Sequence, residues 1–106
     1  MDKLLNFLGL CRRAGKLTTG NDAVVETVVN GEAKMVITAC DISPNTEKKL
    51  LKTCEAHNVK LIKINRTKDE LSFAIGRFAA VASVTDSGFA RNVEKLNNNE
   101  TGGNSV

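Results

Sequence analysis

A basic cluster precedes a glycine that can start a helix in the N-terminal part of this chain. Arg12, Arg13 and Lys16 carry three positive charges, and Gly20 comes directly before residues 21–30, whose valines recur at helical spacing. The first backbone N–H groups of a helix have no partner within it and carry partial positive charge. Cations beside such a helix end attract phosphate groups. These residues therefore predict binding of a phosphate-bearing polymer, that is, a nucleic acid.

Residue patterns for catalysis are weak in this sequence. The single histidine, His57, ends a predicted helix, where a capping or surface role suits it. Gly9, Gly15 and Gly20 match neither a dinucleotide-binding nor a Walker fingerprint. Asp41 follows an apolar strand, where it either acts in a small nucleic-acid enzyme or shapes the next turn. We favour the turn and predict that the chain is not an enzyme.

Three cysteines, Cys11, Cys40 and Cys54, lie within apolar runs. Their odd number and irregular spacing match neither a disulfide framework nor a zinc site. The run 4–10 is too short for a membrane span and has no features of a secretion signal. We therefore expect buried free thiols, a cytoplasmic location, and no metal, cofactor or membrane partner.

Positive charge is concentrated in two segments of the 106-residue chain, whose net charge is +3. Residues 1–20 carry four cations against one carboxylate, and residues 60–77 carry five cations against two carboxylates. The two segments either converge into an electrostatic footprint for nucleic acid or are solvated ends of elements. Aromatic residues make up only 4% of the chain, which disfavours a base-stacking platform such as an RNA-recognition sheet.

Helix and strand signals alternate along the chain. Helices are predicted at residues 2–13, 21–30, 44–57, 68–76 and 87–96, and strands at residues 17–19, 35–40, 59–64 and 79–85. This alternation predicts the α/β class, as a three-layer α/β/α sandwich with a four-stranded mixed sheet. Residues 1–96 form a single domain, and the Asn-, Gly- and Ser-rich residues 97–106 are predicted to form a disordered tail.

The order of several short motifs resembles one protein family. The motifs are Arg13-Ala14-Gly15-Lys16, Asp41-x-x-Pro44, Leu71-x-x-Ala74-x-Gly76-Arg77 and Val84-Thr85-Asp86-Ser87-Gly88-Phe89-Ala90. Across residues 3–96 their order resembles the kink-turn RNA-binding ribosomal proteins of the L7Ae and L30e type, with the bacterial YlxQ-type branch most similar. Each motif alone also suits a structural role, in a turn or in the core. Their joint order indicates the family.

This resemblance implies a mode of binding. Family members bind a sharply bent RNA duplex with tandem sheared G·A pairs, and their second helix begins in its opened major groove. A loop after the Leu-x-x-Ala-x-Gly motif covers an extruded nucleotide. Carried over to this chain, the RNA-binding residues are Arg12, Arg13, Lys16, Thr19, Gly20, Asn21, Asp22, Ala74, Ile75, Gly76 and Arg77. The implied partner is a kink-turn or related bent RNA, in the ribosome or another ribonucleoprotein, bound by a monomer.

Three positions depart from the pattern of archaeal and eukaryotic members. Asp22, Ala23 and Glu26 stand where those members carry Asn, Glu and Lys. Asp22 lacks an amide donor, Ala23 cannot contact a guanine edge, and Glu26 replaces a cation that faces phosphate. Asn21, one position earlier, offers a partial substitute. Two functions stay open: binding of structured RNA, which we favour, and a protein-interaction module that has lost kink-turn specificity.

Overall fold

The helix ends form where local residue patterns predict them. The structure is a computed structural model that describes residues 2–105 and the side chains of residues 2–99. Its elements are α1 (Lys3–Arg13), β1 (Leu17–Thr19), α2 (Asn21–Val29), β2 (Met35–Thr38), α3 (Pro44–Ala56), β3 (Lys60–Lys63), α4 (Lys68–Ile75), β4 (Val81–Val84) and α5 (Ser87–Ser105). Thr67 and Glu70 form the expected capping box before α4. Ser43 caps α3, in which Pro44 takes the first position.

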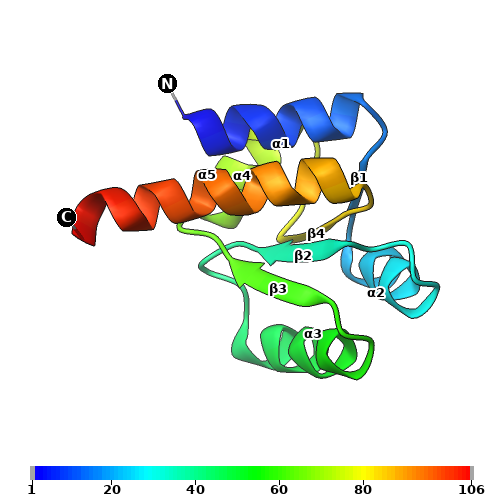
Figure 1. Ribbon diagram of the computed structural model, residues 1–106. Helices are drawn as coiled ribbons and strands as arrows, with labels where there is room; N and C mark the ends of the chain where they lie inside the picture. Colours follow the sequence, from blue (N-terminus) through cyan, green and yellow to red (C-terminus); the bar gives the residue numbers. More distant parts are fainter. Residues whose placement is uncertain (1, 106) are drawn as a thin grey trace.

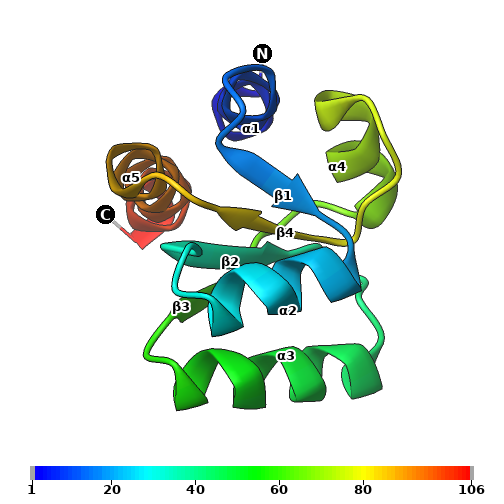
Figure 2. The same cartoon turned by 90° about the vertical axis from the view of Figure 1, so that its right-hand side faces the viewer.

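The four strands form one mixed sheet in the order β1-β4-β2-β3. β2 and β3 are parallel and are joined by α3, whereas β4 is antiparallel to both β1 and β2. α2 and α3 cover one face of the sheet, and α1, α4 and α5 cover the other (Figures 1 and 2). The predicted α/β/α sandwich with a four-stranded mixed sheet is therefore confirmed.

The two central strands, β2 and β4, are buried along their whole length. Their side chains alternate between the two helical layers, as the strand repeat of two residues requires. Met35 and Ile37 pack against α1, α4 and α5, and Val36 packs against α2 and α3. A nearly continuous apolar run therefore fills two cores at once, which is typical of a strand covered on both faces.

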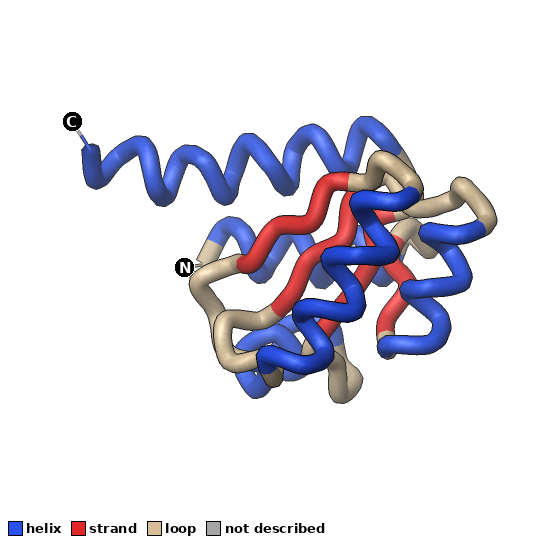
Figure 3. Tube along the Cα trace, turned by 90° about the horizontal axis from the view of Figure 1, so that it is seen from below, coloured by secondary structure: helices blue, strands red, loops and turns tan. Residues whose placement is uncertain are grey.

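The last helix extends beyond its predicted end near Leu96. α5 continues to Ser105, and its C-terminal part reaches past the sheet (Figures 1 and 3). The first part of α5 is held by Phe89 and Leu96, which pack against the core. The helix continues beyond them because each further residue of a helix that has already formed adds one backbone hydrogen bond. The disorder of residues 97–106 in solution stays a prediction. The last residue of this segment, Val106, lies outside the described residues.

The three cysteines are free thiols, but they are not all buried as expected. Cys11 and Cys54 lie in the two cores, where burial raises the pKa of the Cys11 thiol to about 11 and also raises the pKa of Cys54. Both thiols therefore stay protonated and unreactive. Cys40 is exposed, because β2 ends at Thr38 and the chain then turns away from the sheet.

The first helix is tied to the start of the α4 region by an ion pair. Asp2 caps α1 through the Leu5 N–H, and Arg66 Nε and Nη2 donate to the two Asp2 oxygens at 2.6 and 3.0 Å. The bond from Arg66 is the main reason that the pKa of Asp2 lies below its ordinary value of 3.8.

Within residues 2–105, every helix is too short or too polar to serve as a membrane span.

Candidate nucleic-acid interface

The start of α2 and the loop between α4 and β4 lie side by side (Figure 2). The Gly20 N–H donates to the Val81 carbonyl across 3.3 Å, and Thr19 pairs with Ala82 in the sheet. Gly20 has a φ of +97°, a backbone conformation that other residues rarely adopt. We call Gly20, Asn21, Asp22 and residues 76–80 the Gly20 corner. Segments about sixty residues apart in sequence therefore form one surface.

α1 delivers a cation to this corner. It packs so closely on α4 that a Cβ on Gly9 would lie 2.8 Å from the Ala74 carbonyl oxygen. Gly76 ends α4 in the left-handed region, with φ +79°. A Cβ on Gly76 would lie 3.7 Å from Arg12 Nη1, so the Arg12 guanidinium lies beside the loop. Arg12 of the first basic segment thus lies beside Gly76 of the second.

The N-terminus of α2 is open to a ligand. Its N-cap residue is Gly20, which has no side chain that could cap the N–H groups of the first turn. Asn21, Asp22 and Ala23 are exposed, so the first N–H groups of the helix face solvent. Such groups bind phosphate oxygens, although the Asp22 carboxylate in the first turn also satisfies the helix dipole.

α2 is held in place on the sheet by a buried polar contact. The hydroxyls of Thr27 and Ser83 lie 2.8 Å apart, and Thr27 also donates to the Val24 carbonyl at 2.7 Å. Both hydroxyls are buried, where such bonds are costly to leave unpaired. This contact fixes the direction in which the start of α2 points.

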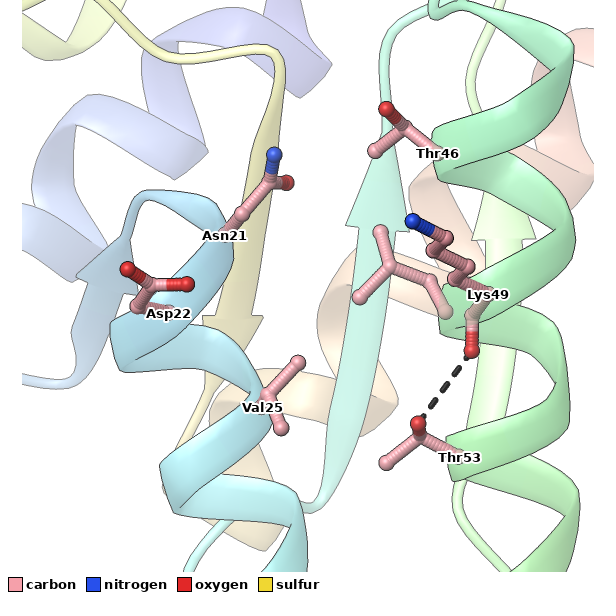
Figure 4. A pocket seen from close by; sticks show the side chains of 7 residues that line it. Asn21, Asp22, Val25, Thr46, Lys49 and Thr53 are labelled. Carbon is pink, nitrogen blue, oxygen red and sulfur yellow. Dashed lines mark hydrogen bonds between the residues drawn. The ribbon is translucent and has the colours of Figure 1, made fainter.

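A groove of about 260 Å³ separates α2 from α3 next to the corner (Figure 4). Its lining residues are Asn21, Asp22, Val25, Thr46, Lys49, Leu50 and Thr53. The Lys49 side chain extends from α3 toward the space between the two helices. Its spacing of three from Thr46 and four from Thr53 was the available signal for a shared helix face.

The other predicted site residues are distributed unevenly around the corner. Arg77 is exposed in the loop that follows Gly76. Lys16 is at the opposite end of β1 from Gly20, where its carbonyl accepts from Thr85. Arg13 lines a different groove, between α1 and α5. The corner therefore gathers only part of the predicted set.

Two residues of the Leu71 to Gly76 motif serve the core. The Ile75 side chain is only 3% exposed and packs with Leu71 beneath α1. It is therefore out of reach of a ligand, and only the backbone at this position is available. Ala74 is half-buried, and its carbonyl lies against Gly9. The prediction that Ile75 binds RNA is therefore compatible with its backbone only.

Residues 2–94 match the ribosomal protein L7Ae/L30e/S12e/Gadd45 family. The chain belongs to this family. It is 34% identical over 94 residues to the RNA-binding protein YlxQ of Enterococcus faecium, covering 89% of this chain and 90% of that protein. It is 38% identical over 91 residues to the RNA-binding protein YlxQ of Bacillus subtilis (strain 168), covering 85% and 90%.

A solved structure has the same fold as this L7Ae-family chain. It is described as a protein with unknown function from Bacillus halodurans C and superposes with a TM-score of 0.87 at 35% identity. The match covers 92% of this chain and 99% of the other. The family that the motif order indicated, with its YlxQ-type relatives, is therefore confirmed.

An exposed aromatic residue at the corner of this L7Ae-family chain was not predicted. Phe78 follows Arg77 in the loop before β4, and its side chain is 74% exposed. A second phenylalanine, Phe73, projects from α4 and is 92% exposed. The low aromatic content had argued against base stacking, but a single ring in the right loop is enough to stack on one base. The signal was its position directly after the Gly76-Arg77 motif.

Asp41 lies in the predicted turn after β2 and has a second role. Its Oδ1 accepts from the Lys68 N–H at 2.8 Å, which ties the end of β2 to the first turn of α4. His57 caps α3, and its Nδ1 lies 3.0 Å from the Thr53 carbonyl oxygen, as expected for a capping residue.

Among the described residues, no group of three or more His, Cys, Asp or Glu side chains could hold a metal ion.

Proposed function

We propose that this protein binds structured RNA through the Gly20 corner, without catalysis. The observation that carries the proposal is the junction of the α2 start with the loop 76–80, where Arg12 lies beside Gly76. The family and the names of the two YlxQ relatives support RNA as the ligand. The unpaired thiols of Cys11 and Cys54 suit a reducing compartment, so we propose action in the cytoplasm.

Each part of the corner has a distinct role in this proposal. The first N–H groups of α2, with Arg12, Arg77 and Lys49, hold phosphate oxygens and so position the RNA. The Asn21 side chain, exposed at the groove, offers an amide donor and an acceptor to a base edge. Phe78 stacks on a base that has left the helical stack. Phosphate contacts supply affinity, and the amide and ring supply selectivity.

We propose a kink-turn or a related bent motif as the RNA, in the ribosome or another ribonucleoprotein. A bent duplex with an extruded nucleotide offers both surfaces that the corner requires. Phosphates are then available for the α2 start, and an unstacked base is available for Phe78. Ala23 and Glu26 lower the affinity, because a missing base contact alone costs about 1–3 kcal/mol. A protein-interaction module of the same fold is the second candidate, favoured by these two exposed side chains.

A titration of labelled RNA tests the function. The protein is expected to bind a kink-turn RNA more tightly than a matched duplex in which Watson–Crick pairs replace the G·A pairs. If Arg12, Lys49 and Arg77 each neutralise one phosphate, affinity falls about 20- to 40-fold between 50 and 200 mM salt. Equal affinity for both RNAs would reject recognition of the bend. Affinity independent of salt would reject the phosphate contacts and favour the protein-interaction candidate.

The loop phenylalanine provides a matched pair of variants. Phe78→Ala is expected to weaken RNA binding by about 5- to 150-fold, because stacking on one base contributes about 1–3 kcal/mol. Phe73→Ala removes an equally exposed ring from α4, outside the corner, and is expected to leave affinity unchanged. Fluorescence anisotropy with the same RNA measures both. Equal effects of the two substitutions would contradict a specific role for Phe78.

A further inference from the structure

A second groove lies in the other helical layer, between α1 and α5. These two helices run side by side and antiparallel (Figures 1 and 2). The groove has a volume of about 340 Å³, and its lining residues are Lys3, Asn6, Phe7, Leu10, Arg13 and Leu96. α2 and α3 lie on the opposite face of the sheet from this groove. The groove is therefore a surface separate from the groove between α2 and α3.

The floor of the α1–α5 groove is apolar and firmly held. The Phe7 ring lies 5.5 Å from the Phe89 ring, centroid to centroid, at an interplanar angle of 48°. This contact holds the Phe7 ring against α5. Leu10 is 45% exposed beside it, and Leu96 closes the α5 side. This apolar floor suits apolar side chains of a partner, and Phe7, Leu10 and Leu96 offer no hydrogen bonds to base edges.

The rim of the groove is positive at both ends. Lys3 and Arg13 are ten positions apart on α1, which is about 15 Å along a helix axis. None of the six described residues that line the groove is acidic. The groove therefore combines an apolar centre with a cation near each end.

We propose that this groove binds an amphipathic helix of a partner protein. Its apolar face covers Phe7, Leu10 and Leu96, and its carboxylates face Lys3 and Arg13. A span of about 15 Å corresponds to about three turns of helix, with the two acidic positions about ten residues apart. The charge of the rim selects an acidic helix over a basic one. This inference goes beyond RNA binding, and it assigns Arg13 to the partner groove.

A selection with displayed peptides tests the proposal. A library of randomised 14-residue peptides is panned on the full chain, and recovered peptides are measured by fluorescence polarisation. Recovered sequences are expected to carry apolar residues at spacings of three and four, with Asp or Glu near both ends. Leu10→Asp is expected to weaken their binding at least about tenfold, because it places a carboxylate on the apolar floor. Lys3→Glu is expected to weaken it severalfold.

A matched substitution controls for general effects. Leu51 on α3 is 43% exposed, so Leu51→Asp makes the same change at a comparable site, and peptide binding is expected to persist. Kink-turn RNA affinity of Leu10→Asp is expected to equal that of the parent. Circular dichroism checks that each variant is folded, and Lys3→Glu tests the rim independently of the floor.

Several outcomes would overturn the proposed partner. Recovery of no peptide that binds the parent protein would contradict a peptide-binding groove. Recovery of basic peptides would contradict selection of an acidic helix by the rim. Equal losses in Leu10→Asp and Leu51→Asp show that the peptides bind elsewhere. Displacement of the peptide by RNA makes the groove part of the RNA surface. Sedimentation that shows self-association, abolished by Leu10→Asp, assigns the groove to a second copy of this chain.

Discussion

Replacing Ala23 with Glu and Glu26 with Lys together is expected to tighten binding of a kink-turn RNA by about 10- to 100-fold, measured by titration of labelled RNA. Both positions are exposed on the first two turns of α2, next to the Gly20 corner. Glu at position 23 can accept from a guanine edge, which contributes about 1–3 kcal/mol. Lys at position 26 replaces an anion by a cation where the RNA backbone is expected to pass.

A control with the same chemical changes separates recognition from net charge. Glu55 and Ala56 are exposed at the end of α3. α3 ends near the start of β3, which pairs with Met35, the first residue of β2. The Gly20 corner lies at the other end of these strands, where Thr38 pairs with Val81. Glu55→Lys with Ala56→Glu is expected to leave affinity unchanged. An equal gain in both double variants, or a gain on RNA without G·A pairs, would show a general charge effect.

The affinity of the parent protein decides between the two candidate functions. A parent that already binds a kink-turn RNA with a Kd near 1 nM, about −12 kcal/mol, excludes the protein-interaction module. In that case Asn21 and Asp22 replace the contacts of the archaeal and eukaryotic members. A parent without measurable binding, which gains it through the double substitution, favours a scaffold that kept the fold and lost the recognition residues.

Gly9→Ala is expected to lower the free energy of unfolding by about 1–3 kcal/mol, because the new methyl group would lie 2.8 Å from the Ala74 carbonyl oxygen. At an open helical site the same change would stabilise by about 1 kcal/mol. The sign of the effect therefore reports the close approach of α1 and α4. Denaturant titration measures it, and Asn6→Ala, on the exposed side of α1, is the control.

The same substitution also tests how α1 positions its cation. Relief of the contact requires α1 and α4 to separate, which moves Arg12 away from Gly76. RNA affinity is therefore expected to fall together with stability in Gly9→Ala, while Asn6→Ala is expected to keep RNA affinity and to stabilise by up to about 0.7 kcal/mol. A Gly9→Ala protein as stable as the parent would show that the two helices can separate without cost. The corner would then not depend on their close packing.

Elements whose signals lie within a few residues were predicted from the sequence. The capping box of Thr67 and Glu70 and the cap at Ser43 each depend on residues three positions apart. Gly20 and Gly76 mark backbone conformations that other residues rarely adopt, and both lie at predicted boundaries. Because these interactions are local, the order of helices and strands follows from them, and the alternation specifies the layers.

Features that depend on long-range partners were not predicted. Asp41 bonds to a backbone group 27 positions along the chain, so no local pattern could reveal its role at α4. Cys40 extends an apolar run, yet it is exposed because the strand has already ended. Ile75 belongs to a recognised motif, and only the packing of α4 under α1 shows that its side chain serves the core.

The sequence by itself determined the family, the fold class and the two segments that meet at the Gly20 corner, because helix caps, glycines and apolar periodicity act over short distances. The tertiary structure alone decided which side chains share a surface. Arg12 and Arg13 are adjacent in sequence but about 100° apart around α1. Arg12 therefore lies beside Gly76, whereas Arg13 lies over Gly9 and also lines the groove toward α5, because the direction of each side chain around α1 decides which surface it joins.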